Sequence, residues 1–219
     1  MAINPDSVKQ LLDSEDFGDR IRGINQLRHL DPQVAFELVK PLVKDPNTRV
    51  RYAAVSQFDT IGHENLAESL AILKDVLYND PEPDVQAAAA DAIGGLKLTE
   101  AYDDLAKVYH QTNEWLIQFS IIACLGELGE PRAFELLREA LTEENELIKT
   151  CAISALGELG DRRAIPLLSQ FINDPDSQIR YRLAQSLGHL GGEEAQTLLQ
   201  QLAKDKNEQV AQAAKSQLN

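Results

Sequence analysis

Apolar residues recur along the chain with helical spacing, and this pattern is itself repeated. After Ile148, apolar side chains follow at three, four, five, seven, eight and eleven positions, which places them on one wide face of a helix. The same pattern begins again about every 31 residues. Its first residues, here called anchors, are Ile21, Val50, Val85, Ile117, Ile148, Ile179 and Val210. The series predicts seven helical units that cover the chain.

Each unit is predicted to continue into a second helix. A glycine follows the anchor helix at Gly129, Gly160 and Gly191, where a left-handed residue commonly ends a helix. A second apolar run then begins, as it does from residue 164 to residue 171. Aspartate is expected to cap free amides before three anchor helices, and the proline after it ends the preceding helix, at Asp45-Pro46, Asp80-Pro81 and Asp174-Pro175. Each unit is therefore a predicted helical hairpin.

The hairpins are expected to stack, because one hairpin cannot bury both of its apolar faces. The predicted fold is all-α: one right-handed α-α superhelix of about seven hairpins, a single domain over residues 1–219. Regularity fails near residues 96–119, where "GGLKLTEAYDD" and "YHQTNEWLIQ" replace the glycine stop and the Asp-Pro entry. Trp115, in this irregular junction, is expected to be exposed or half-buried. It is a candidate partner-binding residue or the filler of an awkward junction, and the sequence leaves both open.

Composition narrows the range of partners. The chain has 219 residues, of which 43% are hydrophobic, and a formal net charge of -14. That charge repels polyphosphates, so nucleic acid is not an expected partner. There is no apolar run of about 18 residues and no targeting peptide at the acidic start, so we expect no membrane insertion and a cytoplasmic location. Cys124 and Cys151 occupy apolar positions of the repeat and are expected to lie in the core.

The columns after the anchors hold the candidate binding residues. Anchor helices of repeat arrays commonly line the binding face. Arg51 precedes Tyr52, Arg180 precedes Tyr181, and Phe119 occupies the tyrosine position in another unit. Cations beside flat aromatic rings match a ligand that has carboxylates and a planar ring system. Arginine at this position equally fits a structural role, in which it bonds acidic residues of the adjacent unit. Both interpretations stay open.

The repeat resembles the HEAT-like repeats of the phycobilin lyase group, through the pattern "DPxxxVRxxAxxxLGxLG". The strings "SEDFGDRIRGINQLRHLDP" and "DPNTRVRYAAVSQF", and the irregular segment that ends at Phe119, are similar more specifically to cyanobacterial phycobilisome degradation proteins. The resemblance covers nearly the whole chain. Its repeat part is shared with many scaffolds, and the irregular segments carry the discrimination.

The resemblance implies a scaffold that binds phycobiliprotein subunits or their bilin and promotes antenna disassembly or chromophore detachment. Two alternatives stay open: a phycocyanobilin lyase subunit, and a general scaffold for protein interactions. No cofactor is expected, although phycocyanobilin is a candidate ligand. The sequence does not decide whether the chain is an enzyme. The family's activity maps onto no short motif here, so catalytic residues stay unknown, and an enzyme would be a lyase acting on the bilin-cysteine thioether bond.

The four histidines do not predict a metal site. The pair His63-Glu64 resembles one His-Glu pair of the deoxyhypusine hydroxylases, HEAT-repeat enzymes that assemble an iron site from several such pairs. The corresponding places hold Leu98-Thr99, Glu130-Pro131, Asp161-Arg162 and Gly192-Glu193. Because a single pair cannot supply that site, no metal is expected.

Overall fold

The computed structural model describes residues 3–218, and these residues form helices and no strand. Seven helices contain or adjoin the anchors: α2 (Phe17–Gln26), α4 (Thr48–Ser56), α7 (Pro83–Gly95), α9 (Trp115–Leu128), α11 (Glu146–Leu159), α13 (Ser177–Leu190) and α15 (Glu208–Gln217). The remaining α-helices are α1 (Pro5–Leu12), α3 (Pro32–Val39), α5 (Phe58–Ile61), α6 (Leu66–Asn79), α8 (Tyr102–Gln111), α10 (Ala133–Ala140), α12 (Ala164–Leu168) and α14 (Glu193–Leu202). Short 3-10 helices are η1 (Leu27–His29), η2 (Lys40–Lys44), η3 (Gly62–Asn65), η4 (Thr99–Ala101) and η5 (Ser169–Phe171). The predicted all-α repeat fold is confirmed.

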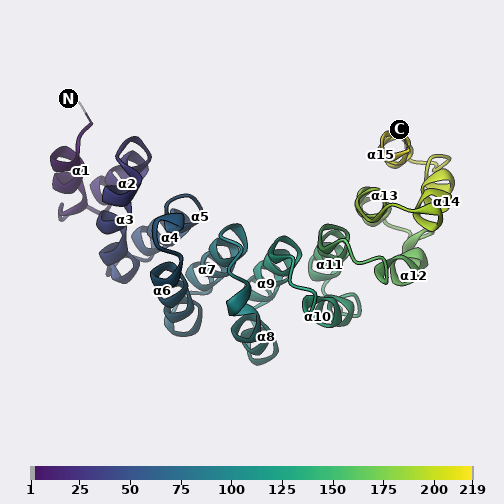
Figure 1. Ribbon diagram of the computed structural model, residues 1–219, viewed down its shortest axis with the longest axis horizontal. Helices are drawn as coiled ribbons and strands as arrows, with labels where there is room; N and C mark the ends of the chain where they lie inside the picture. The colour runs from purple at the N-terminus through teal and green to yellow at the C-terminus, as the bar shows by residue number, and fades with distance from the viewer. Residues whose placement is uncertain (1–2, 219) are drawn as a thin grey trace. The chain divides into compact units, whose positions relative to one another are not determined.

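The chain divides into two compact units, Met1–Ser120 and Ile121–Asn219, so α9 begins in the first and ends in the second. In the first unit α4 packs between α2 and α7, and in the second α13 packs between α11 and α15. The intervening helices form a second layer in each unit; α6 packs on α7, α10 packs on α11, and α14 packs on both α13 and α15 (Figure 1). Each unit thus has a layer of anchor helices, whose outer face is free of the second layer.

The helix starts correct the register of the first unit. Six anchor helices begin two residues before their anchor, at Thr48, Pro83, Trp115, Glu146, Ser177 and Glu208. Because α2 begins at Phe17, its equivalent of an anchor is Asp19, and the prediction of Ile21 was wrong by two residues. In this register the buried Ile24 and Leu27 correspond to Val55 and Phe58. The error arose because Ile21 is only half-buried, at the edge of the apolar face.

The three predicted glycine stops are confirmed, and a fourth equivalent position holds a lysine. Gly129, Gly160 and Gly191 have φ of 68°, 72° and 61°, in the region that glycine adopts at little cost. At the equivalent position after α7, Lys97 has φ of 56°. A lysine in this conformation is strained by roughly 1–2 kcal/mol, because its Cβ crowds the backbone. The irregular junction therefore has the positive φ of the other helix ends but lacks the glycine that favours it.

The aspartates before the anchor helices do not cap those helices. Asp45 accepts a hydrogen bond from the backbone N–H of Asn47 at 2.8 Å, and Asp174 accepts one from Asp176 at 2.9 Å. The N-cap residues of α4 and α13 are Asn47 and Asp176 themselves, two positions later. Each earlier aspartate therefore fixes a turn, and its second carboxylate oxygen stays available for another partner.

The core is made mainly of leucine, isoleucine, valine and alanine from both helix layers, with Phe36, Phe58 and Tyr109 as its largest buried side chains. Cys124 is buried, as predicted, and Cys151 is half-buried. Within residues 3–218, no helix has the length and apolar character needed to cross a membrane.

Candidate binding surface

Arg51 is a structural link between repeats. Its Nε and Nη2 donate to Oδ2 and Oδ1 of Asp80 at 2.7 and 3.0 Å, and its Nη1 donates to the carbonyl of Asp45 at 3.0 Å. The side chains of Arg51 and Asp80 are 11% and 5% exposed. A two-pronged pair so well shielded from water is strong, because the guanidinium fork matches the carboxylate. All three nitrogens of the guanidinium therefore donate to groups of the protein.

The same link recurs at two other repeats. Arg180 donates to both carboxylate oxygens of Asp205 at 2.7 and 2.9 Å and to the carbonyl of Asp174 at 2.6 Å. Arg20 pairs with Asp45 at 2.8 Å. We call these three pairs Arg–Asp struts. They match the structural interpretation that the sequence left open, since Arg51 and Arg180 would have to abandon buried partners to bind a ligand.

Electrostatics at the struts follow from these bonds. Hydrogen bonds to Asp80 and Asp205 hold the pKa of Arg51 and of Arg180 above its usual range. The hydrogen bond from Arg180, in turn, lowers the pKa of the Asp205 carboxyl. Both partners of the Arg180 strut thus stay charged over a wider pH range than they would in water.

The tyrosine next to Arg51 is exposed and lies in a groove. Tyr52 is 49% exposed, and it lines a groove of about 380 Å³ with Thr48, Arg49 and Asp84. The Arg49 guanidinium lies 6.0 Å from the ring centre of Phe17, which is itself 41% exposed. The first unit therefore does present a cation beside aromatic rings, but the cation is Arg49.

Two further aromatic residues occupy equivalent places on α9. Trp115 is 47% exposed, which confirms the predicted exposure, and Phe119 is half-buried. Trp115 and Phe17 are both the first residue of an anchor helix. Phe119 stands at the repeat position of Tyr52. The corrected register also adds Ile21 to that column, so the first unit carries an apolar column of Ile21, Tyr52, Ala87 and Phe119.

Tyr181 lies in a different setting within the second unit. It is half-buried and lines a groove of about 670 Å³ between α13 and α15. The groove is lined by Gln178, Tyr181, Gln185, Glu208, Gln209, Gln212, Ala213, Ser216 and Gln217. No arginine lines it, because Arg180 points into the strut. The repeated Arg-Tyr pairs of the sequence therefore do not produce two equivalent sites.

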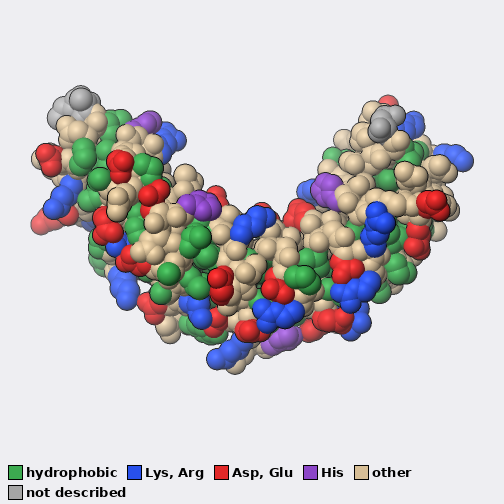
Figure 2. Space-filling view, viewed as in Figure 1, with side chains coloured by type: hydrophobic (Ala, Val, Ile, Leu, Met, Phe, Trp, Pro, Cys, Tyr) green, Lys and Arg blue, Asp and Glu red, His purple; other side chains and the backbone are tan. Residues whose placement is uncertain are grey.

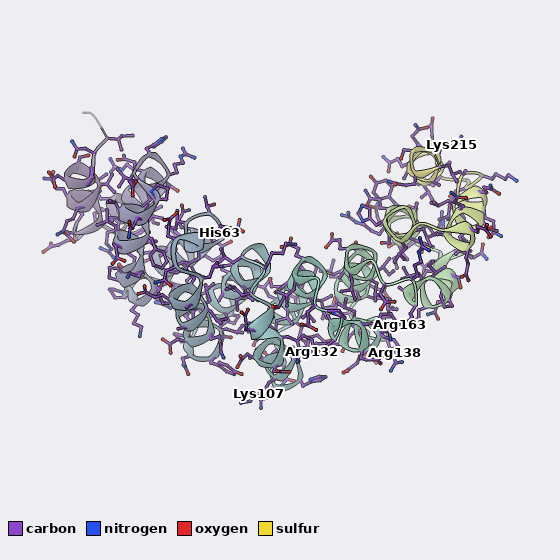
Figure 3. The ribbon with its side chains drawn as sticks, viewed as in Figure 1. His63, Lys107, Arg132, Arg138, Arg163 and Lys215 are labelled. Carbon is purple, nitrogen blue, oxygen red and sulfur yellow. The ribbon has the colours of Figure 1, made fainter. Side chains whose placement is uncertain are left out.

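Three further exposed arginines are neutralised locally. Arg132, Arg138 and Arg163 gather around α10, in the second helix layer (Figure 3). They pair with Glu130, Glu135 and Asp161 at 3.1, 2.6 and 2.6 Å. Basic and acidic side chains alternate across the face seen in Figure 2. In residues 3–218, no group of three or more His, Cys, Asp or Glu side chains is placed to hold a metal ion.

Sequence reasoning missed Phe17, Arg49 and the glutamine-lined groove. Phe17 was missed because of the shifted register of α2. It lies four residues before Ile21, but it is the first residue of α2, just as Trp115 is the first residue of α9. Arg49 precedes its anchor, and only the columns after the anchors were considered. Gln178 and Gln209 share that same preceding column. Reading the column before each anchor would have found Arg49, Gln178 and Gln209, whereas finding Phe17 also required the correct register of α2.

Comparison with known proteins places the chain in a family. A family model of HEAT repeats matches residues 70–153 and 143–219, so the chain belongs to the HEAT-repeat family. No curated protein matches the chain in sequence.

Several solved structures share the fold at low identity. The complex of CpcE and CpcF of phycocyanin lyase from Nostoc sp. PCC7120 aligns with a TM-score of 0.67 and 18% identity, over 100% of this chain and 94% of that one. The archaeal HEAT-like repeats protein from Thermococcus onnurineus NA1 aligns with a TM-score of 0.61 and 13% identity, over 100% and 97%. An engineered protein aligns with a TM-score of 0.57 and 17% identity, over 98% and 67%. Identities this low establish the fold alone.

Proposed function

We propose that the chain is a phycobilisome degradation factor of the non-bleaching protein B type: a HEAT-repeat scaffold that binds phycobiliprotein subunits through their bilin. Support comes from the irregular sequence segments, which resemble that group, and from the likeness over the full chain to a phycocyanin lyase complex. In this role the chain binds the antenna and promotes its disassembly or the detachment of its chromophore.

The observation that carries the proposal is the pairing of an exposed cation with exposed aromatic rings in the first unit. A bilin has a planar conjugated system and propionate carboxylates. Tyr52 and Phe17 offer aromatic faces, and Arg49 between them offers a guanidinium for a carboxylate. We propose Arg49 as the cation in place of Arg51 and Arg180, whose forks already hold Asp80 and Asp205. Phe119 and Trp115 are proposed as further contacts along the same helix layer.

The test is binding of phycocyanin subunits with and without their chromophore. Tyr52→Ala and Arg49→Gln are each expected to weaken binding of the chromophore-loaded subunit about 5- to 10-fold, the size of one aromatic or charge-assisted contact. Arg138→Gln, which changes an exposed arginine of α10, is the matched control and is expected to leave binding unchanged. Equal binding by all three variants would rule out this site.

Absorption spectra of the same mixtures separate the alternatives. Binding without a spectral change supports the degradation scaffold. Transfer or release of the bilin, seen as a shift in visible absorption, supports the lyase alternative, which the full-chain likeness to the CpcE and CpcF complex favours over other enzymes. Binding to neither form of phycocyanin would leave a general scaffold for protein interactions, which the HEAT repeats support by themselves.

A further inference from the structure

The groove between α13 and α15 is lined by amides to an unusual degree. Five of its nine lining residues are glutamines, and Glu208 is its one charged residue. This is a marked departure for a chain with a net charge of -14. Gln217 packs on Gly188 of α13, but neither the repeat packing nor the proposed bilin site uses Gln178, Gln209 or Gln212.

Most of these carboxamides have no partner in the protein. Gln185 donates to the hydroxyl of Tyr181 at 3.4 Å and accepts from Nη1 of Arg182 at 3.2 Å. The side chains of Gln178, Gln209 and Gln212 form no hydrogen bond within residues 3–218. Each free carboxamide offers both a donor and an acceptor. A peptide group has that same combination, so two walls of glutamine can satisfy a polypeptide backbone laid between them.

The dimensions of the groove suit a short extended segment. Gln178 and Gln185 lie seven residues apart on one wall, which is about 10 Å along a helix at 1.5 Å per residue. Gln209 and Ser216 span the same length on the other wall. An extended chain rises about 3.3 Å per residue. The walls therefore cover about three residues of an extended polypeptide.

Charge specifies the occupant further. Glu208 is exposed in the first turn of α15, and it forms no ion pair within residues 3–218. The strongly negative chain attracts a basic segment and repels an acidic one. A neutral sugar would match the amides but would leave Glu208 without a partner, whereas a lysine or arginine in the segment would pair with it.

We propose that the groove between α13 and α15 binds an extended polypeptide segment of about three residues, with a basic side chain next to Glu208. The glutamines of both walls bond its backbone, and the Tyr181 ring packs against one of its side chains. This site lies in the second unit and does not depend on the bilin site of the first.

The experiment is selection of displayed random heptapeptides on the immobilised full chain. Peptides with a basic residue are expected to be enriched. Gln178→Ala and Gln212→Ala are each expected to weaken the best peptide about fivefold, the effect of one lost hydrogen bond. Gln196→Ala, at an exposed glutamine of α14, is the matched control and is expected to leave affinity unchanged. N-methylation of the central peptide amide is expected to reduce binding by a similar factor, because it removes a backbone donor.

A double-mutant cycle tests the charge. Replacing the basic residue of the peptide by glutamine is expected to weaken its binding to the natural chain about two- to fivefold. The same replacement is expected to leave the affinity for the Glu208→Gln variant unchanged. Glu194→Gln, in the first turn of α14, is the control for a remote charge. The proposal is overturned if no peptide is enriched, if enriched peptides bind the Gln178 and Gln212 variants as tightly as the natural chain, or if maltoheptaose binds the groove while the peptides do not.

Discussion

The junction between α4 and α7 and the junction between α11 and α13 join consecutive repeats by different means. At the first, the strut of Arg51 and Asp80 crosses the junction, with both side chains nearly buried. At the second, the position of Arg51 holds Lys149, which pairs instead with Glu146 of its own helix at 2.8 Å. Here the helices approach so closely that a Cβ on Gly157 would lie 2.6 Å from the Cα of Ser186.

The difference shows that two consecutive repeats can be joined through a strut or through a close helix contact. Gly157 stands nine residues after its anchor, and the equivalent residue near α4 is Asp59, which is exposed. A glycine at this position lets two backbones meet and gains dispersion contacts over their length. At the junction of α4 and α7, the arginine side chain reaches across to Asp80 instead. Both kinds of junction pack over the same kind of apolar core, so the repeat fold is the same at each.

The largest expected effect comes from removing the acidic partner of a strut. Asp80→Ala leaves the Arg51 guanidinium nearly buried and without its carboxylate, so we expect the free energy of unfolding to fall by about 3–5 kcal/mol. Asp174 holds the equivalent position at the junction of α11 and α13, five residues before its anchor, and fixes the same kind of turn. Within residues 3–218, however, its carboxylate does not pair with the guanidinium of an arginine. Asp174→Ala is therefore expected to cost only about 1 kcal/mol.

Urea unfolding of the two variants measures this contrast. Because the turns are equivalent, the difference between the two variants measures mainly the loss of the carboxylate that holds the Arg51 fork. Equal losses of stability would mean that the turns, and not the struts, hold these junctions.

The second effect concerns the close contact. Alanine normally stabilises a helix by about 0.5–1 kcal/mol relative to glycine. At Gly157 its Cβ would meet the backbone of Ser186, which cannot rotate away. We expect Gly157→Ala to lower the free energy of unfolding by about 1–3 kcal/mol, the usual cost of overpacking. Ser154→Ala, at a half-buried position one turn earlier, is expected to change it by less than about 0.5 kcal/mol. A rise in stability for Gly157→Ala would contradict the close approach.

The sequence predicts the two junction types only in part. Helical periodicity and glycine stops predict the fold, because burial of an apolar stripe is a local property of the chain. The role of Arg51 is not local: its choice between a ligand and Asp80 depends on a residue 29 positions away. The grooves at Tyr52 and Tyr181 depend on neighbouring repeats in the same way. The register of α2 was misplaced because Ile21 is an apolar residue at the boundary of the buried face. There, periodicity alone does not decide whether Ile21 or Asp19 aligns with the anchors of the other helices.

Acid should weaken a strut and spare the close contact. The hydrogen bond from Arg180 lowers the folded-state pKa of Asp205 below its unfolded value. The pair therefore contributes its full stability above an unfolded pKa of about 3.9 and loses it as the pH falls through the lower folded value. We expect the stability difference between the natural chain and Asp205→Asn to be constant from about pH 7 to pH 5 and to shrink below about pH 4. The loss for Gly157→Ala has no carboxylate at its origin and should not follow that curve.

The smallest effect lies at the irregular helix end between the two junction types. Lys97 has the positive φ that Gly129, Gly160 and Gly191 have at their helix ends. Lys97→Gly removes a strain of roughly 1–2 kcal/mol but also adds freedom to the unfolded chain, which costs about 0.5–1 kcal/mol. We expect a net gain in the free energy of unfolding of about 0.5–1 kcal/mol. The reverse substitution is Gly129→Lys. No atom lies within 4 Å of the added Cβ, so only the strained backbone conformation affects stability, and we expect the free energy of unfolding to fall by a similar amount. Thermal unfolding of both variants measures the pair. A loss of stability for Lys97→Gly would show that contacts of the lysine side chain outweigh the strain of its backbone.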